Sequence, residues 1–449
     1  MSAGTRSQRH SSFISESGDT TRNGRLVLRL KKLVSVDFHP GSDKYDHAFV
    51  YLFLASAVLR LIWLDRPVGL LIFDETYYVN VARILLRLPQ QPEVWPAAIP
   101  GIDSVNQEHP LLAKLLIALS VAILGDNGWG WRIPSVVFGL LAIFVLYLLL
   151  KKMSKNPLIA LIGSFLFSFD TLVFVHSRIA TLDIFVSSFM IIGFYCYFSG
   201  RLKLSAFSMA LATLCKIGGF YGAVTLGAFH LARELLSKGR KPDWQGLLAV
   251  FEKYAIVYLG SFILLLAALD FFWAGYKNPF EHLSYIYTYT FALRAPDVRA
   301  PNDIWSYPWE WLLNQVRIHY AVVNVSVYTD GTVTRTYPSV DFVGAMNPTV
   351  LFLAIPAVLY NVYSYYETKS DFSLFVVAWF SMTYLPFIPA AFFGHRIMYI
   401  FYFLNTIPAV AAGIANMIVE QSPPRVIVIV YVIAVAVGFY TLFPFKTVP

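Results

Sequence analysis

Charged residues are scarce in this chain. Only 14% of its 449 residues are charged, whereas a soluble globular domain carries roughly 25%. The hydrophobic share is 57%, and the mean hydropathy is +0.59. This balance excludes an ordinary soluble protein, a disordered chain and a fibre, and it indicates a polytopic membrane protein.

Cysteine and the common ligand motifs are also nearly missing. The two cysteines, Cys196 and Cys215, lie in apolar runs, so a disulfide framework is not expected. No HExxH, CxxC or paired-histidine spacing supports a dedicated metal site. A Walker loop and a GxGxxG helix start are absent, so nucleotide binding is not indicated. We therefore expect that no cofactor is required, although a divalent metal is not excluded.

Basic residues are concentrated in the first 44 residues. The net charge is +8, and residues 1–44 hold eight Lys/Arg against four Asp/Glu. We interpret this excess as a membrane-orientation signal and not as a nucleic-acid footprint. The same segment is rich in Ser, Arg, Gly and Thr, which predicts a disordered tail.

Apolar runs repeat from residue 45 to residue 443. A helix needs about 20 apolar residues to cross a bilayer. We predict eleven spans, of which 204–217 is short: 46–64, 133–150, 157–173, 182–199, 204–217, 219–236, 253–274, 346–365, 373–392, 397–419 and 424–443. The run 110–124 is shorter and carries Lys114, so we expect an interfacial helix there. The predicted fold class is an all-α bundle of about eleven transmembrane helices.

The basic loops orient this bundle. With the N-terminus inside, the inner segments hold most of the Lys/Arg, although the outer segments are nearly twice as long. The prediction is a cytoplasmic tail 1–44, a transmembrane catalytic domain 45–443 and a short outer tail 444–449. Two long loops, 65–132 and 275–345, then lie outside. The second contains the sequon Asn324-Val325-Ser326, on the side that permits glycosylation.

Ionisable residues share the outer side of this topology. Such residues at membrane depth are costly and usually functional. They are Asp74, Glu75, His109, Lys114, Arg132, His176, Arg178, Asp183, Lys216, His395 and Arg396. Together they predict an active site at the outer membrane boundary.

Each part of this set also has a plainer interpretation. Asp74 and Glu75 either begin a helix, with Asp74 as its N-cap, or supply a general base whose pKa is raised in a dry setting. Arg132, Lys216 and Arg396 either anchor span ends or hold an anion such as a lipid phosphate. Histidines in such places more often pack through hydrogen bonds than act as catalysts.

Ordered motifs carry a family resemblance from about residue 45 to residue 420. They are Phe73-Asp-Glu-Thr-Tyr-Tyr78, Glu108-His-Pro-Leu-Leu-Ala-Lys114, Trp131-Arg-Ile-Pro-Ser135, His176-Ser-Arg-Ile-Ala-Thr-Leu-Asp183, Cys215-Lys-Ile-Gly-Gly219, Ser306-Tyr-Pro-Trp-Glu-Trp311, Gly344-Ala-Met-Asn-Pro348, Tyr384-Leu-Pro386 and His395-Arg-Ile-Met-Tyr-Ile-Phe-Tyr402. The set resembles the protein O-mannosyltransferases, which are dolichyl-phosphate-mannose–protein mannosyltransferases of the GT-C class. Leu111 departs from the family pattern, in which a second proline follows the histidine. Loop 275–345 is too short to hold the β-trefoil (MIR) domain of eukaryotic members. In this respect the chain resembles the prokaryotic forms.

The resemblance implies a role for each matching residue. Asp74 matches the general base, Glu75 its orienting neighbour and Asp183 the second acid. Arg132, Lys216 and Arg396 match positions at the donor phosphate. Further site candidates are His109, Lys114, His176, Arg178 and His395.

The implied activity is inverting transfer of a sugar, mannose by the resemblance, from a polyprenyl (dolichyl) phosphate to Ser/Thr hydroxyls of proteins. The expected partners are this donor, a protein or peptide acceptor and membrane lipid, without nucleic acid; oligomerisation is left open. One alternative is a GT-C transferase that glycosylates a lipid or glycan, as aminoarabinose transferases do. Another is a transporter of lipid-linked sugars, although no clear internal repeat supports it.

Overall fold

Helices form most of the protein. The computed structural model describes residues 44–88, 105–236, 242–330 and 332–447. In the first half of the chain the helices are α2 (Lys44–Leu61), α3 (Glu75–Leu85), α4 (Leu112–Leu124), α5 (Gly128–Ser154), α6 (Pro157–Ser168), α7 (Thr171–His176), α8 (Asp183–Phe198), α9 (Leu202–Cys215) and α10 (Phe220–Leu235). They continue with α11 (Trp244–Leu269), α12 (Pro279–Ala292), α13 (Pro308–Trp311), α14 (Pro348–Phe352), α15 (Ala354–Thr368), α16 (Asp371–Tyr384), α17 (Phe387–Phe392), α18 (Ile407–Gln421) and α19 (Arg425–Thr441).

The predicted spans agree with these helices. Each of the eleven corresponds to one helix or to consecutive helical segments. Within the described residues, three helical stretches are long and apolar enough to cross a membrane: Gly128–Ser154, Trp244–Ala274 and Asp371–Phe392. Further apolar helices are shorter, so the number of eleven spans stays a prediction. The structure has a helix, α4, where the interfacial helix is expected over 110–124, and its place along the membrane stays a prediction. Nearly all of the predicted tail 1–44 lies outside the described residues.

Short polar residues fix where several helices begin. The side chain of Asn127 accepts hydrogen bonds from the first turn of α5, and Asn156 does the same for α6. Asp170 caps α7 in this way and so divides the span predicted over 157–173 into two helices. These contacts satisfy backbone N–H groups that a helix start leaves unpaired, which matters most in an apolar environment.

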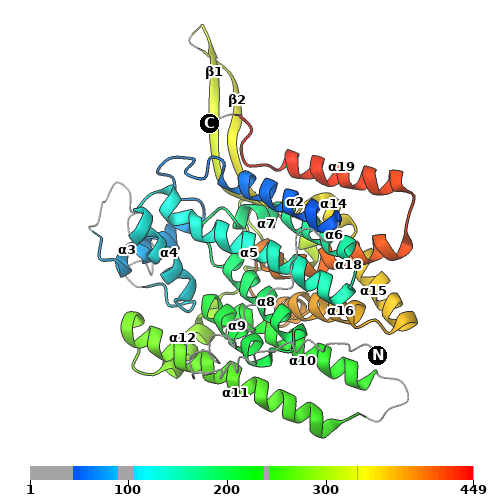
Figure 1. The fold of residues 1–449 in the computed structure, drawn as a ribbon. Helices are drawn as coiled ribbons and strands as arrows, with labels where there is room; N and C mark the ends of the chain where they lie inside the picture. The colour runs from blue at the N-terminus through cyan, green and yellow to red at the C-terminus, as the bar shows by residue number, and fades with distance from the viewer. Residues whose placement is uncertain (1–43, 89–104, 237–241, 331, 448–449) are drawn as a thin grey trace, which may run out of the picture. The chain divides into compact units, whose positions relative to one another are not determined.

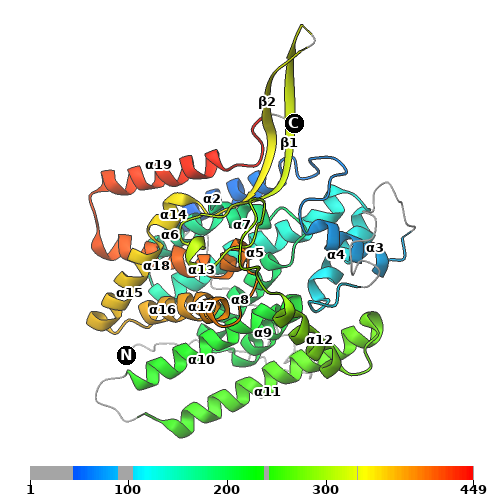
Figure 2. The ribbon, with the colours of Figure 1, turned by 180° about the vertical axis from the view of Figure 1, so that it is seen from behind.

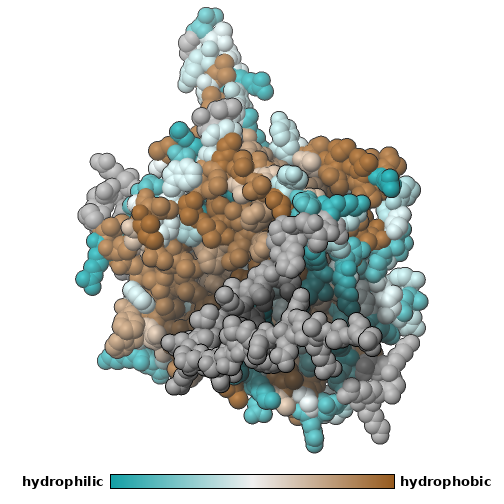
Figure 3. Space-filling model, viewed as in Figure 1, coloured by the Kyte–Doolittle hydropathy of each residue, from teal (hydrophilic) through white to brown (hydrophobic). Residues whose placement is uncertain are grey.

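The helices pack around α8. Helix α8 lies against α5 and α9, α9 continues the packing to α11, and α10 packs on α16 (Figures 1 and 2). Helix α19 leaves most of its surface uncovered, with Val426, Ile429 and Val430 more than half exposed. Figure 3 shows hydrophobic residues across the face that carries α19 and α5. An exposed apolar surface of this extent fits contact with lipid.

A β-hairpin departs from the all-α prediction. Strand β1 (Ile318–Thr329) pairs antiparallel with β2 (Thr332–Gly344) inside the predicted outer loop 275–345. The hairpin extends away from the helices (Figure 1). Its base is fastened by the chain end, because the Asp341 N–H donates to the Pro444 carbonyl at 2.8 Å and the Lys446 N–H donates to Ser339 at 2.8 Å. Asn324 of the sequon is exposed on β1.

Candidate active site

A cavity of about 500 Å³ lies where α8, α9, α10 and α12 meet the segments around Thr383 and Arg396. Its charged and histidine lining comes from His109, Asp183, Lys216 and Arg396. Its other lining is mostly apolar or aromatic: Val186, Ile217, Phe220, Tyr221, Leu283, Ile286, Tyr287, Phe291, Phe387, Ala390 and Tyr402. A charged end joined to an apolar body suits an amphipathic molecule.

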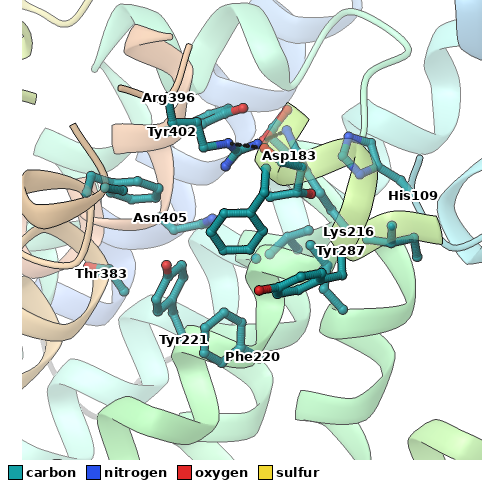
Figure 4. A pocket seen from close by; sticks show the side chains of 18 of the residues that line it. His109, Asp183, Lys216, Phe220, Tyr221, Tyr287, Thr383, Arg396, Tyr402 and Asn405 are labelled. Atoms are coloured by element: carbon teal, nitrogen blue, oxygen red, sulfur yellow. Dashed lines mark hydrogen bonds and ion pairs between the residues drawn. The ribbon is translucent and has the colours of Figure 1, made fainter. Parts of the chain in front are cut away.

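Lys216 and Asp183 form an ion pair in this cavity. The Lys216 Nζ donates to Asp183 Oδ1 at 2.8 Å (Figure 4). Asp183 is the first residue of α8, and Lys216 directly follows the end of α9 in an extended conformation. The Nζ also lies 5.0 Å from the Phe401 ring centre and 5.2 Å from that of Tyr402. An ammonium has three N–H donors, so Lys216 keeps donors for a further anion.

A tight turn holds Lys216 in place. Residues Ile217–Gly219 form a single 3-10 turn between α9 and α10. A Cβ on Gly219 would lie 2.3 Å from the backbone carbon of Ala212. Glycine therefore allows the turn to pack directly on α9 and to aim Lys216 into the cavity.

Arg396 adds a second cation to the cavity. Its Nε donates to the Thr290 carbonyl at 3.1 Å, and its guanidinium lies 5.8 Å from the ring centre of Tyr402. The terminal guanidinium nitrogens have no hydrogen-bond partner among the described residues. A planar pair of free donors is the geometry that binds a phosphate well.

Asp74 occupies the N-cap position of α3 without capping it. Its backbone is already helical, with φ −66° and ψ −5°, and its side chain makes no cap hydrogen bond. The N-cap interpretation of Asp74 is therefore wrong. Burial raises the pKa of Asp74 to about 7, while nearby Lys216 lowers it and Asp183 raises it. Asp74 thus lies within electrostatic reach of the ion pair, with a carboxylate that can accept a proton near neutral pH.

Glu75 has a different environment from its neighbour. Its oxygens accept hydrogen bonds from Arg132 Nε and Nη2, both at 2.8 Å, and from the N–H groups of Ile72 and Ala180. Arg132 also donates to the carbonyls of Leu64, Arg66 and Leu70.

These contacts use every N–H of the Arg132 guanidinium. Glu75 is 0% exposed and Arg132 is 1% exposed, and neither lines the cavity. Arg132 therefore has no N–H group left to bind the phosphate of the sugar donor.

The remaining predicted residues divide between the cavity and the surrounding framework. His109 lines the cavity. Lys114 is buried and donates to the carbonyls of Val105, Asn106 and His109. The structure brings His109, Asp183, Lys216 and Arg396 together in the cavity lining, whereas Asp74 is outside this lining and within electrostatic range of Lys216 and Asp183.

Three predicted residues lie elsewhere. His176 is bonded between Thr181 and Tyr320, and burial lowers its pKa to about 4. Arg178 donates to carbonyls at the end of α2, including that of Ile62 at 2.6 Å. His395 is exposed and does not line the cavity.

Several cavity residues were not predicted as site residues. They are uncharged: Thr383, Tyr221, Tyr287, Tyr402 and Asn405 (Figure 4). Tyr221 follows the lysine motif by a few residues, and Tyr402 ends the late motif, so their neighbourhood was the available signal. Among the described residues, no group of three His, Cys, Asp or Glu side chains is placed to hold a metal. The expectation that no cofactor is required stays a prediction.

Comparisons with known proteins agree with the motifs. The family model described as dolichyl-phosphate-mannose-protein mannosyltransferase matches residues 108–259. A polyprenol-phosphate-mannose–protein mannosyltransferase of Mycolicibacterium smegmatis is 30% identical over 168 residues, which are 37% of this chain and 31% of that protein. The match therefore spans about a third of the mycobacterial relative. A protein of the same name from Corynebacterium glutamicum is 22% identical over 82% of this chain and 80% of its own length.

A second group of relatives has another name. An undecaprenyl phosphate-alpha-4-amino-4-deoxy-L-arabinose arabinosyl transferase of Pseudomonas paraeruginosa is 29% identical over 29% of this chain and 23% of that protein.

Solved structures share the fold. The S. cerevisiae protein O-mannosyltransferase Pmt1-Pmt2 complex, bound to the sugar donor, aligns with a TM-score of 0.65 and 12% identity. The alignment covers 92% of this chain and 91% of that chain. ArnT from Cupriavidus metallidurans, bound to undecaprenyl phosphate, aligns with a TM-score of 0.53 and 17% identity. The alignment covers 82% of this chain and 60% of that chain. The family model, the named relatives and the shared fold thus confirm the resemblance to the protein O-mannosyltransferase family.

Proposed function

We propose that this protein is an inverting glycosyltransferase that moves mannose from a polyprenyl phosphate to Ser/Thr hydroxyls of proteins. The observation that carries the proposal is the cavity with Lys216 and Arg396 at its charged end and an apolar body beside them, with Asp74 within electrostatic range of Lys216. The apolar body suits a prenyl chain, and the two cations suit its phosphate. The relatives that are named polyprenol-phosphate-mannose–protein mannosyltransferases support the choice of donor.

The reaction then follows from the placement of charge. Asp74 removes the proton of the acceptor hydroxyl, and the acceptor oxygen bonds to the anomeric carbon. The bond from that carbon to the phosphate oxygen breaks, and the electron pair leaves with polyprenyl phosphate. A positioned base contributes roughly 10²–10⁴-fold to such a step. Fixed cations stabilise the negative charge that grows on the phosphate.

Asp183 and the Glu75–Arg132 pair have supporting roles in this mechanism. Asp183 fixes the Lys216 ammonium by its hydrogen bond. The buried Glu75–Arg132 pair fixes the segment before α3 and so positions Asp74. The pair is a positioning element because both side chains are fully buried and are engaged by each other and by backbone groups.

We place this chemistry at the extracytoplasmic (or ER luminal) face of a multi-pass membrane protein whose N-terminus is cytoplasmic. The support is the excess of Lys/Arg in the predicted inner segments. Asp183, Lys216 and Arg396 all lie at predicted outer span ends.

The decisive experiment is transfer by the purified protein in detergent. Labelled mannosyl-phosphoryl-polyprenol is incubated with a Ser/Thr-rich peptide, and the labelled peptide is measured by mass spectrometry. In detergent there is no membrane to transport across, so formation of labelled peptide also distinguishes a transferase from a transporter. No transfer to any hydroxyl acceptor, with a folded protein and intact donor, would refute the proposal.

A lipid or glycan acceptor is the second candidate. The similarity to aminoarabinosyl transferases in sequence and to ArnT in fold favours it. The same assay with a lipid extract in place of the peptide distinguishes the two, because labelled product then migrates with lipid.

A further inference from the structure

The loop Val105–Pro110 carries buried polar atoms without partners. Among the described residues, Glu108 Oε2 and His109 Nδ1 are shielded from solvent and make no hydrogen bond. Leaving such an atom unpaired costs about 1–3 kcal/mol, so native proteins rarely tolerate it without a reason. Here two occur on consecutive residues, and one of them lines the cavity.

The same loop is fastened on one side by Lys114. Its buried ammonium donates to the carbonyls of Val105, Asn106 and His109. All three N–H donors of the ammonium have an acceptor in this way. The backbone of the loop is therefore held from within α4.

Gln107 fastens the loop on the other side. Its carbonyl accepts a hydrogen bond from His282 Nε2 at 2.8 Å, and its side-chain oxygen accepts one from Tyr276 at 2.8 Å. The opposite nitrogen of His282 is bonded to Asp270 at 2.7 Å. Asp270 begins a π-helical turn that ends α11, and such turns are frequent at functional sites.

The loop is thus rigid in its backbone while Glu108 and His109 stay unsatisfied. A subsite of preorganised polar groups has this form, because supporting hydrogen bonds hold it ready for a ligand. His109 faces the cavity beyond the Lys216–Asp183 pair, on the side away from Arg396 (Figure 4). Burial, Lys216, Lys114 and Arg396 keep the pKa of His109 well below its usual value, so the ring is neutral and can pair with a hydroxyl.

Three tyrosines lie within electrostatic range of Glu108. Burial and the Glu108 carboxylate raise the pKa of Tyr289 to about 12, and the pKa values of Tyr77 and Tyr285 rise for reasons that include the same carboxylate. Tyr285 and Tyr289 face each other on α12 with ring centres 6.3 Å apart. A carboxylate that accepts hydrogen bonds beside aromatic rings suits a ligand with several hydroxyls and apolar C–H faces.

We propose that Glu108 and His109 form the subsite that recognises the hydroxyls of the donor sugar, held in place by the Gln107–His282–Asp270 clamp. This inference rests on the proposed function, because the sugar is attached directly to the phosphate that Lys216 and Arg396 bind. His109 lines the same cavity as these two cations, so a sugar ring joined to the phosphate shares an enclosed space with it. Glu108 and His109 then select the sugar, and the clamp residues are positioning residues.

The test uses mannosyl-phosphoryl-polyprenol and its 2-, 3-, 4- and 6-deoxy analogues as donors, with one peptide acceptor. We expect the wild type to discriminate against at least one deoxy donor by on the order of 10²-fold in kcat/KM, because a site built for a hydroxyl rejects a ligand without it. Glu108→Ala should lower kcat/KM for the parent donor. It should discriminate against that analogue by less than about 3-fold, because the variant lacks the carboxylate with which the hydroxyl of the parent donor pairs. Glu108→Gln keeps the shape and checks folding by its melting temperature.

Control and clamp variants sharpen the result. Glu281→Gln changes an exposed carboxylate on α12, and we expect wild-type selectivity from it. His282→Gln loosens the clamp, and we expect a raised donor KM with reduced selectivity and an unchanged peptide KM.

Three outcomes would overturn the subsite. Equal kcat/KM for all donors in the wild type is the first, and an equal loss for all donors in Glu108→Ala is the second. A change confined to peptide KM would assign the loop to the acceptor. Absence of transfer from every donor would instead refute the proposed function itself, and is thus distinguishable.

Discussion

Replacing Asp74 by asparagine should remove activity and stabilise the protein above neutral pH. Burial raises the pKa of Asp74 from 3.8 to about 7, so ionising this carboxyl in the folded protein is costly. At about 1.4 kcal/mol per pKa unit, the full difference amounts to about 4 kcal/mol. Because the side chain is only partly buried, water screens part of this cost, and we expect about 1–3 kcal/mol.

The sign of the pH dependence follows from linkage. The folded protein holds the Asp74 proton to a higher pH than the unfolded chain does. Asp74 therefore contributes full stability below about pH 4 and loses it as the pH rises through about 7. Asp74→Asn should melt at the wild-type temperature near pH 4.5 and a few degrees higher at pH 8.

Activity should follow the opposite course. In the wild type, kcat/KM should rise about tenfold per pH unit below pH 7 and level off near pH 8, because only the ionised base accepts a proton. Asp74→Asn should lose roughly 10²–10⁴-fold in kcat at every pH. The assays are thermal melting in detergent and peptide mannosylation over pH 5–9. Asp65→Asn, nine residues earlier and with a side chain that is 38% exposed, is the control. Near-normal kcat in Asp74→Asn, or equal melting at pH 8, would refute the reasoning.

The remaining predictions concern the cations, the buried pair and the turn. Lys216→Met and Arg396→Met should each lower kcat/KM about a hundredfold, as expected for losing about 3 kcal/mol of charge stabilisation. Lys203→Met, at the far end of α9, should leave kcat/KM unchanged. Unchanged kinetics in both Lys216→Met and Arg396→Met would refute the phosphate site. Glu75→Gln should lower the free energy of unfolding by about 3–5 kcal/mol because it leaves Arg132 buried without its anion, and adding Arg132→Met should recover part of it in the same melting assay. Gly219→Ala should cost about 1–3 kcal/mol and raise donor KM, since its Cβ meets the Ala212 backbone at 2.3 Å; Gly218→Ala, with open space around its Cβ, should keep its melting temperature, and equal melting of the two would contradict the steric argument.

The helical part of the fold could be predicted because hydropathy acts locally. Each predicted span has a helical counterpart, and Asp170 shows why one span is divided, since its side chain caps α7 in mid-span. The hairpin could not be predicted in this way. Its strands have mixed polar and apolar residues, and its base depends on distant partners such as His176 and Pro444.

The sequence predicts which residues belong to the site better than it predicts how they are arranged. Residue type and motif order selected Asp183, Lys216 and Arg396, which the fold brings to one cavity. The sequence could not separate Asp74 from Glu75, because their difference lies in partners 57 and 105 residues away along the chain. The unpaired atoms of Glu108 and His109 are likewise visible only when every neighbour has been placed.

The Glu75–Arg132 pair has a consequence for the electrostatics of the whole cavity. Two bare carboxylates side by side would repel an incoming phosphate and would raise each other's proton affinity. Arg132 cancels one of these charges before any ligand arrives, and it uses all its own donors to do so. Of these two adjacent acids, only Asp74 is therefore left without an arginine partner, and only its proton equilibrium has to be tuned for turnover.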